Sequence, residues 1–242
     1  TTTMSGSITT SGEDGYGIYN EGNSNRTEMS GSIIATGLKG IAIGDERNSN
    51  KTTISGIISI NVDDYTGTLD KETIAYGAGV GYWASGNNNT AAISGSITVV
   101  RPYGYGAVTS GSNNSIAISG TVKASGSKSI ALYALGGDGS TFTLNEGAVI
   151  IGEIRSANKG DDEKPSSTNS KLVFNLGESK SYAYNIAGNG VGTGAGQWTY
   201  SDLDGRTQGV TAGITGCDLS VEKYNFSKDS YDILYVLLNW FS

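Results

Sequence analysis

The sequence Ile93-Ser-Gly-Ser-Ile97 is one of five copies of a short phrase, Ile/Met-Ser-Gly-x-Ile/Val, and this phrase decides the fold. The copies begin at Met4, Met29, Ile54, Ile93 and Ile118, so the steps between them are 25, 25, 39 and 25 residues. A period of about 20 to 50 residues is typical of a solenoid, in which each unit covers the apolar face of its neighbour. The spacing therefore predicts a stack of coils.

Apolar columns within the repeat predict β-strands. The first residue of each phrase and the residue four positions later are aliphatic in every copy, with glycine between them. Side chains alternate along a strand, so we expect these two residues to share one face of a single extended strand. Repeated glycine and β-branched residues disfavour a helix. A second strand is predicted by an apolar pair 12 and 14 residues after each phrase begins: Tyr16 and Ile18, Ile41 and Ile43, Tyr105 and Ala107, and Ile130 and Leu132.

The 39-residue step indicates an insertion in one coil. When 14 residues are removed from it, Val80 and Tyr82 take the places of the apolar pair. We place the insertion within residues 60–74 and expect it to project from the stack as a loop.

Asparagine recurs four residues before each of the four later phrases, at Asn25, Asn50, Asn89 and Asn114. Asparagine tolerates the left-handed backbone region and bonds to local backbone at turns. Repeated at one position of every coil, it predicts a structural ladder along one edge of the stack. The first phrase has no such asparagine because the chain begins three residues before Met4. We therefore expect further coils upstream of this chain.

Regularity divides the chain into three parts. Residues 1–155 are expected to form regular coils, residues 156–170 an exposed loop, and residues 171–242 irregular coils or a cap. At about 25 residues per coil, the 242 residues predict roughly nine coils.

Charge and hydropathy exclude several classes of partner. The net charge is −7, and lysine and arginine do not cluster. Binding to nucleic acid depends on neutralising phosphates, so nucleic acid is excluded as a partner. No apolar run reaches the roughly 18 to 20 residues of a membrane span, so we expect no membrane insertion of this segment. The single Cys217 cannot form a disulfide within the chain.

Catalytic chemistry has few candidate residues. Histidine is absent, which excludes Ser-His-Asp and Cys-His catalysis and the common zinc motifs. We interpret the acidic groups as solvated loop charge, with a calcium site or glycosidic catalysis as alternatives. These groups are Asp63, Asp64, Asp70 and Glu72 in the insertion, and Asp161, Asp162 and Glu163 in the later loop. The expectation is a protein that is not an enzyme and uses no cofactor or metal.

Aromatic residues are the better candidates for recognition, because exposed tyrosine and tryptophan dominate interfaces. Tyr16, Tyr82 and Tyr105 fall in or near the apolar columns, and we interpret them as core residues. The candidate partner contacts lie on or beside the insertion and turns; they are Asp63, Asp64, Tyr65, Tyr76, Trp83 and Tyr103.

The Ile-Ser-Gly-Ser-Ile phrases, the asparagine-rich turn Ser85–Thr90 and elements such as Gly17-Ile-Tyr19 resemble bacterial autotransporter passenger domains. The resemblance covers Thr1 to about Ile154. It implies an all-β, right-handed parallel β-helix (β-solenoid). It also implies a location at the bacterial cell surface, attached to the outer membrane, or secretion from the cell.

This family includes adhesins, toxins and proteases. We hypothesise a non-enzymatic adhesin, a rod whose projecting loops bind a host-surface protein receptor or a glycan. Self-association of rods is a further expected contact. Two alternatives stay open: a carbohydrate-active β-helix, such as a lyase or a tailspike-like hydrolase, and a purely structural spacer.

Overall fold

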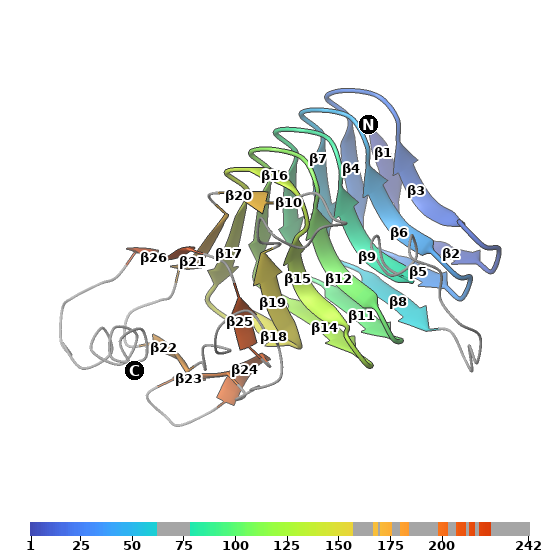
Figure 1. Ribbon diagram of the computed structural model, residues 1–242. Coiled ribbons are helices and arrows are strands. Elements are labelled where there is room, and N and C mark those ends of the chain that lie inside the picture. Colours follow the sequence, from blue (N-terminus) through green and yellow to red (C-terminus); the bar gives the residue numbers. More distant parts are fainter. Residues whose placement is uncertain are drawn as a thin grey trace.

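The computed structural model describes residues 1–61, 78–156, 167–168, 170–175, 180–183, 198–202, 207–211, 213–215 and 218–223. In these ranges the regular structure is β, and the chain winds repeatedly through three parallel sheets. We name them sheets A, B and C in the order in which the chain enters them. Figure 1 shows the coils stacked side by side along one axis, with the N-terminal coil at one end. The protein is therefore a parallel β-solenoid.

Each coil contributes one strand to each sheet. Sheet A contains β1 (Thr2–Met4), β4 (Arg26–Met29), β7 (Lys51–Ile54), β10 (Thr90–Ile93), β13 (Ser115–Ile118), β17 (Thr141–Asn145), β21 (Lys171–Asn175) and β26 (Asp218–Lys223). Sheet B contains β2 (Ser7–Thr10), β5 (Ser32–Ala35), β8 (Ile57–Asn61), β11 (Ser96–Val100), β14 (Thr121–Ser125) and β18 (Val149–Ile151). Sheet C contains β3 (Tyr16–Asn20), β6 (Gly40–Asp45), β9 (Gly79–Ala84), β12 (Gly104–Thr109), β15 (Ile130–Ala134), β19 (Glu153–Ser156) and β25 (Gly213–Thr215).

The described residues form about six complete windings rather than roughly nine, from β1–β2–β3 to β17–β18–β19. The estimate of nine counted all 242 residues, including those outside the described ranges. Other strands leave this pattern. β16 (Gly137–Asp138) pairs with β20 (Ser167–Thr168), and β22 (Lys180–Ala183), β23 (Trp198–Asp202) and β24 (Thr207–Thr211) form an antiparallel sheet.

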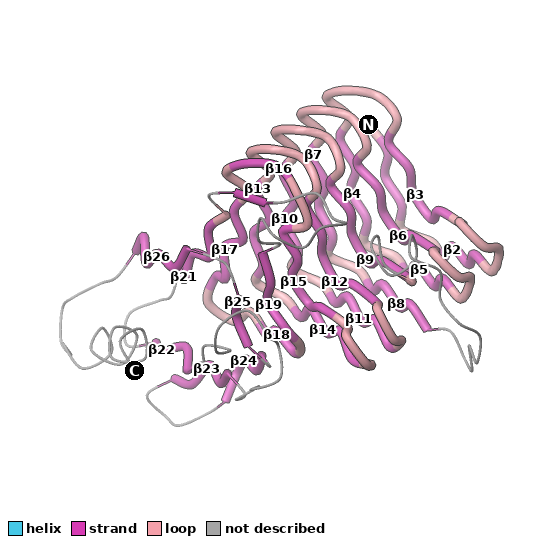
Figure 2. Tube along the Cα trace, in the orientation of Figure 1, coloured by secondary structure: helices cyan, strands magenta, loops and turns pink. Residues whose placement is uncertain are grey.

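The repeated Ser-Gly phrase forms a corner between sheets A and B. Met29 ends β4 and Ser32 begins β5. The expectation that one strand carries both aliphatic residues of the phrase is therefore wrong, although both side chains enter the same core. In the next coil, the backbone amides of Ser55 and Gly56 donate hydrogen bonds to the Met29 carbonyl, at 2.9 and 3.1 Å. Bonds of this kind stack the corners. Figure 2 shows equivalent loops of successive coils lying one behind another along the axis.

The three sheets enclose one apolar core built from the predicted columns. Burying one such side chain contributes about 1.5 to 3 kcal/mol. Sheet A supplies Met29, Ile54, Ile93 and Ile118; sheet B supplies Ile33, Ile58, Ile97 and Val122; sheet C supplies Ile43, Tyr82, Ala107 and Leu132. Because each column repeats in every coil, the core continues along the whole stack.

The register of sheet C agrees with the 14-residue offset. Val80 is paired with Ile41, and Tyr82 is paired with Ile43. The additional residues of this coil lie between the end of β8 at Asn61 and the start of β9 at Gly79. Residues 62–77 lie outside the described ranges.

The four recurring asparagines lie at the corner between sheets C and A. The backbone amides of Asn25, Asn50 and Asn89 each donate to the side-chain oxygen of the asparagine in the following coil, at 2.8 Å. Each side chain therefore bonds to backbone rather than to another side chain. In this arrangement the oxygen of one coil satisfies an amide of the preceding coil, and these corner amides do not depend on water.

A second ladder runs beside the first and in the opposite sense. The backbone amides of Asn48, Asn87 and Ser112 donate to the side-chain oxygens of Asn23, Asn48 and Asn87 in the preceding coils, at 2.7 to 2.9 Å. The residue between the two ladders has a positive φ in these four coils: Ser24, Ser49, Asn88 and Asn113. Sequence analysis missed this ladder, although its signal, asparagine two residues before the first ladder, recurs in three coils.

A buried carboxylate interrupts the apolar core in the first three coils. Asp45 at the end of β6 accepts hydrogen bonds from Asn20 Nδ2 (2.6 Å), Thr52 Oγ1 (2.8 Å) and the Tyr82 hydroxyl (2.7 Å). A charge taken out of water is tolerated only when such donors surround it. Burial, together with the charge of Asp45, raises the pKa of the Tyr82 phenol well above its usual value.

Stability is expected to fall at alkaline pH. Unfolded tyrosine ionises near pH 10, whereas folded Tyr82 keeps its proton to higher pH. Its contribution is therefore complete below about pH 10 and is lost as the pH rises above that value, because only the unfolded chain then releases the proton. We expect the melting temperature to fall between about pH 9 and 11, and to fall less in Tyr82→Phe. An equal slope in the two proteins, measured by circular dichroism, would contradict this assignment.

Candidate binding site

In β3, β6, β9, β12 and β15 of sheet C, a small residue lets two adjacent residues face the core, so the residues on either side of that pair face outward. Glycine or alanine stands between the two apolar positions, and a Cβ on Gly17 would lie 2.8 Å from Ile33 Cγ2 of sheet B. The small residue and the one after it thus both face the core. The residues on either side of this inward pair, such as Tyr16 and Tyr19 in β3, then share the outer face of sheet C.

The outer face of sheet C carries two columns of large side chains, which we call the aromatic face. Parallel pairing aligns the members of each column in successive coils. One column is Tyr16, Ile41, Val80, Tyr105, Ile130 and Glu153. The other is Tyr19, Gly44, Trp83, Val108, Tyr133 and Arg155.

The part of the aromatic face in the first coil is open to solvent. Tyr16 and Tyr19 are 41% and 39% exposed, and their rings are tilted by 41° with centroids 4.4 Å apart. Beneath them is Gly44, where an added Cβ would lie 3.2 Å from the Tyr19 ring. The Tyr19 hydroxyl donates to the Glu46 carboxylate. These contacts hold the two rings in place on the surface.

The electrostatic surroundings of this tyrosine pair are negative. Partial burial, followed by the charges of Asp14 and Glu46, raises the pKa of Tyr16. The hydrogen bond to Glu46 is the main cause that raises the pKa of Tyr19 to about 12, with smaller contributions that include the charge of Glu21. Every charged side chain that shifts these two phenols is therefore a carboxylate.

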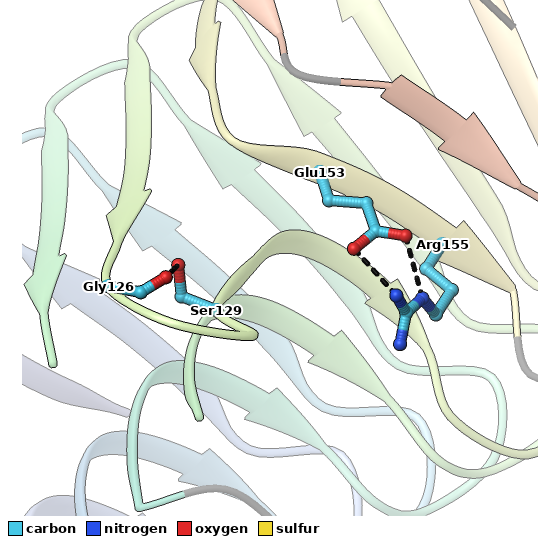
Figure 3. Close-up of polar contacts among 4 residues, drawn as sticks. All are labelled: Gly126, Ser129, Glu153 and Arg155. Carbon is cyan, nitrogen blue, oxygen red and sulfur yellow. Dashed lines mark hydrogen bonds and ion pairs between the residues drawn. The ribbon is translucent and has the colours of Figure 1, made fainter. Parts of the chain in front are cut away.

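Farther along the stack the aromatic face is buried. Tyr105 and Tyr133 form an edge-to-face pair with centroids 5.1 Å apart, in a cluster separate from the main core. Trp83 packs against this cluster and donates from Nε1 to Ser110 Oγ at 2.8 Å. The aromatic face ends in the sixth coil at β19. There the Arg155 guanidinium donates hydrogen bonds to both carboxylate oxygens of Glu153, at 2.7 and 2.8 Å (Figure 3).

Two of the six predicted contact residues, Trp83 and Tyr103, lie within the described ranges. Asp63, Asp64, Tyr65 and Tyr76 lie outside the described residues, as do Cys217 and the acidic groups of both loops. Trp83 belongs to the aromatic face and is half-buried. Tyr103 lies at the corner between sheets B and C with a φ of 54°, and the Lys128 ammonium is 5.1 Å from its ring centroid.

Three tyrosines interpreted as core residues occupy different environments. Tyr82 lies in the main core, whereas Tyr105 is buried in the outer cluster and Tyr16 is exposed. Sequence analysis missed Tyr19 and Glu46 as surface partners of Tyr16. The signal that could have found Tyr19 is Gly17 in the sequence Tyr16-Gly-Ile-Tyr19. When a small residue faces the core together with the residue after it, the two tyrosines on either side of this pair lie on the outer face.

Within the described ranges, no group of three or more His, Cys, Asp or Glu side chains could hold a metal ion. The described part of the chain also contains no helix long and apolar enough to cross a lipid bilayer. Comparison of the chain with protein-family models, with curated proteins and with solved structures found no match. The fold defines the class, a parallel β-solenoid with an aromatic face, and the function is a matter for proposal.

Proposed function

We propose that this chain is a surface-exposed or secreted bacterial passenger segment of the autotransporter type that acts as a non-enzymatic adhesin. The observation that carries the proposal is an open aromatic surface on a stacked, rod-forming scaffold. Tyr16 and Tyr19 are large side chains held in contact and left in solvent. Adjoining exposed apolar side chains often mark an interaction site, and aromatic residues dominate binding energy at interfaces.

The additional residues between β8 and β9 are the second proposed contact region. Other coils pass from sheet B to sheet C in a few residues, as between Ala35 and Gly40. Here residues 62–78 separate β8 from β9, and both strands pair in register with the next coil. A solenoid tolerates such an insertion because the coil on either side still pairs with its neighbours. The proposed partner is a host-surface protein or glycan.

Binding of the purified chain to cultured host cells tests the proposal. The parent is expected to bind saturably. A variant that lacks residues 63–73 is expected to bind more weakly at an unchanged melting temperature, because the deletion leaves β8 and β9 intact. A control, Ile57→Ser on the outer face of sheet B, is expected to bind like the parent. Absence of binding by the parent would favour the structural spacer, and release of reducing ends from a polysaccharide would overturn the non-enzymatic role.

A further inference from the structure

We propose that Tyr16, Tyr19 and Glu46 form a recognition site for a cationic side chain, an arginine or lysine presented by a protein partner. This inference deepens the proposed function and rests on it, since it names the chemistry that one part of the surface would recognise. Its evidence is the geometry of the two rings and the sign of the charges around them.

The two rings offer their faces to a cation. A guanidinium or ammonium group is attracted to the face of a tyrosine within about 6 Å of the ring centroid. Tyr16 and Tyr19 have centroids 4.4 Å apart and an angle of 41° between their planes, so one cation can lie against both. Their exposure of about 40% leaves room for it.

Carboxylates complete the site. Glu46 accepts the hydroxyl of Tyr19 through Oε2, which leaves Oε1 for a partner. Asp14 and Glu21 are the other charged groups whose fields act on the two phenols, and both are exposed. A neutral sugar can donate its hydroxyls to these carboxylates but gains no charge–charge attraction from them. A cation gains from both the ring faces and the carboxylates, and the net charge of −7 would speed its approach.

The chain contains the same pairing in a closed form. Lys128 lies over the ring of Tyr103, 5.1 Å from its centroid. Among the described residues, no lysine or arginine lies over the ring of Tyr16 or Tyr19 in this way. Tyr103 is therefore the control: a tyrosine at the corner between sheets B and C whose ring already has a cation.

Titration with a hexapeptide of alternating glycine and arginine tests the inference in the full chain. Isothermal titration calorimetry measures the affinity of every variant, and the ring signals of isotopically labelled tyrosine locate the site in the parent. The parent is expected to show saturable shifts at Tyr16 and Tyr19. The double variant Tyr16→Ser/Tyr19→Ser keeps the net charge and is expected to bind about fivefold more weakly or worse. Glu46→Gln is expected to weaken binding as well, and Tyr103→Ser to bind like the parent.

Equal affinity of the double variant and the parent would overturn the inference, because it would show attraction by net charge alone. Shifts at Tyr16 and Tyr19 with a neutral N-acetylglucosamine trimer, and none with the arginine peptide, would also overturn it in favour of a glycan. Either failure leaves host-cell binding by the parent unaffected. The proposed function and this inference therefore fail by separate measurements.

Discussion

The Ile58→Asp variant is expected to lose about 4 kcal/mol or more of folding free energy, a large part of the roughly 5 to 15 kcal/mol by which a typical domain is stable. Ile58 is fully buried in the core between the three sheets. Its neighbours in its own column are Ile33 and Ile97, which offer no hydrogen-bond donor or positive charge. An aspartate there would have to ionise without a partner or take up a proton.

The adjacent residue is the control. Ile57 lies in the same strand but points outward and is 60% exposed. Ile57→Asp adds the same charge to the same strand and is expected to change stability by less than about 0.5 kcal/mol. Urea denaturation followed by circular dichroism measures both variants. Similar midpoints for the two would show that the inward and outward faces of sheet B are assigned incorrectly.

Gly95→Ala is expected to destabilise the stack by about 2 to 3 kcal/mol, although it adds one methyl group. A Cβ at Gly95 would lie 2.1 Å from the carbonyl oxygen of Gly56 in the preceding coil. Both sides of this contact are backbone, so no side chain can rotate away. The two coils would have to separate at the corner, which would weaken the hydrogen bonds from Ser94 and Gly95 to the Ile54 carbonyl.

Gly6→Ala is the matched comparison. Gly6 holds the same position in the first coil, but a Cβ there would meet nothing within 4 Å. We expect this variant to melt like the parent. If both alanine variants were neutral, coil contact at the corner would not be the reason for the glycine. If Gly6→Ala were equally costly, the cause would be the conformation of the corner and not its neighbour.

Much of the solenoid could be predicted because a short repeated phrase, read directly from the sequence, determines which residues of successive coils are aligned. Five copies of one phrase at a nearly constant period define which residues lie above one another, and the positions of Val80 and Tyr82 show that this holds across the insertion. The asparagine column could be found in the same way. A one-dimensional repeat needs no knowledge of distant contacts, since each coil meets only its neighbours.

The failures concern where the chain bends and which way individual side chains point. The corner at Ser-Gly was taken for continuous strand, because alternation alone does not show where a chain bends. Tyr16 was placed inside, because an inward position and an outward one can be equally apolar in sequence. Asp45 gave no sign of burial either, since its donors come from the coils before and after its own: Asn20 from the first coil, and Thr52 and Tyr82 from the third.

Periodicity alone established the winding, the equivalence of the coils and the alignment of their columns, because these follow from the repeat distance. The three-dimensional arrangement was needed to show the direction of each side chain, the corners and the pairing of Tyr16 with Tyr19. These features depend on steric contact between sheets. Gly17, for example, has no side chain and leaves room for Ile33 of sheet B, so that Tyr16 and Tyr19 on either side of the inward pair point toward solvent. The proposed recognition site is a product of that packing.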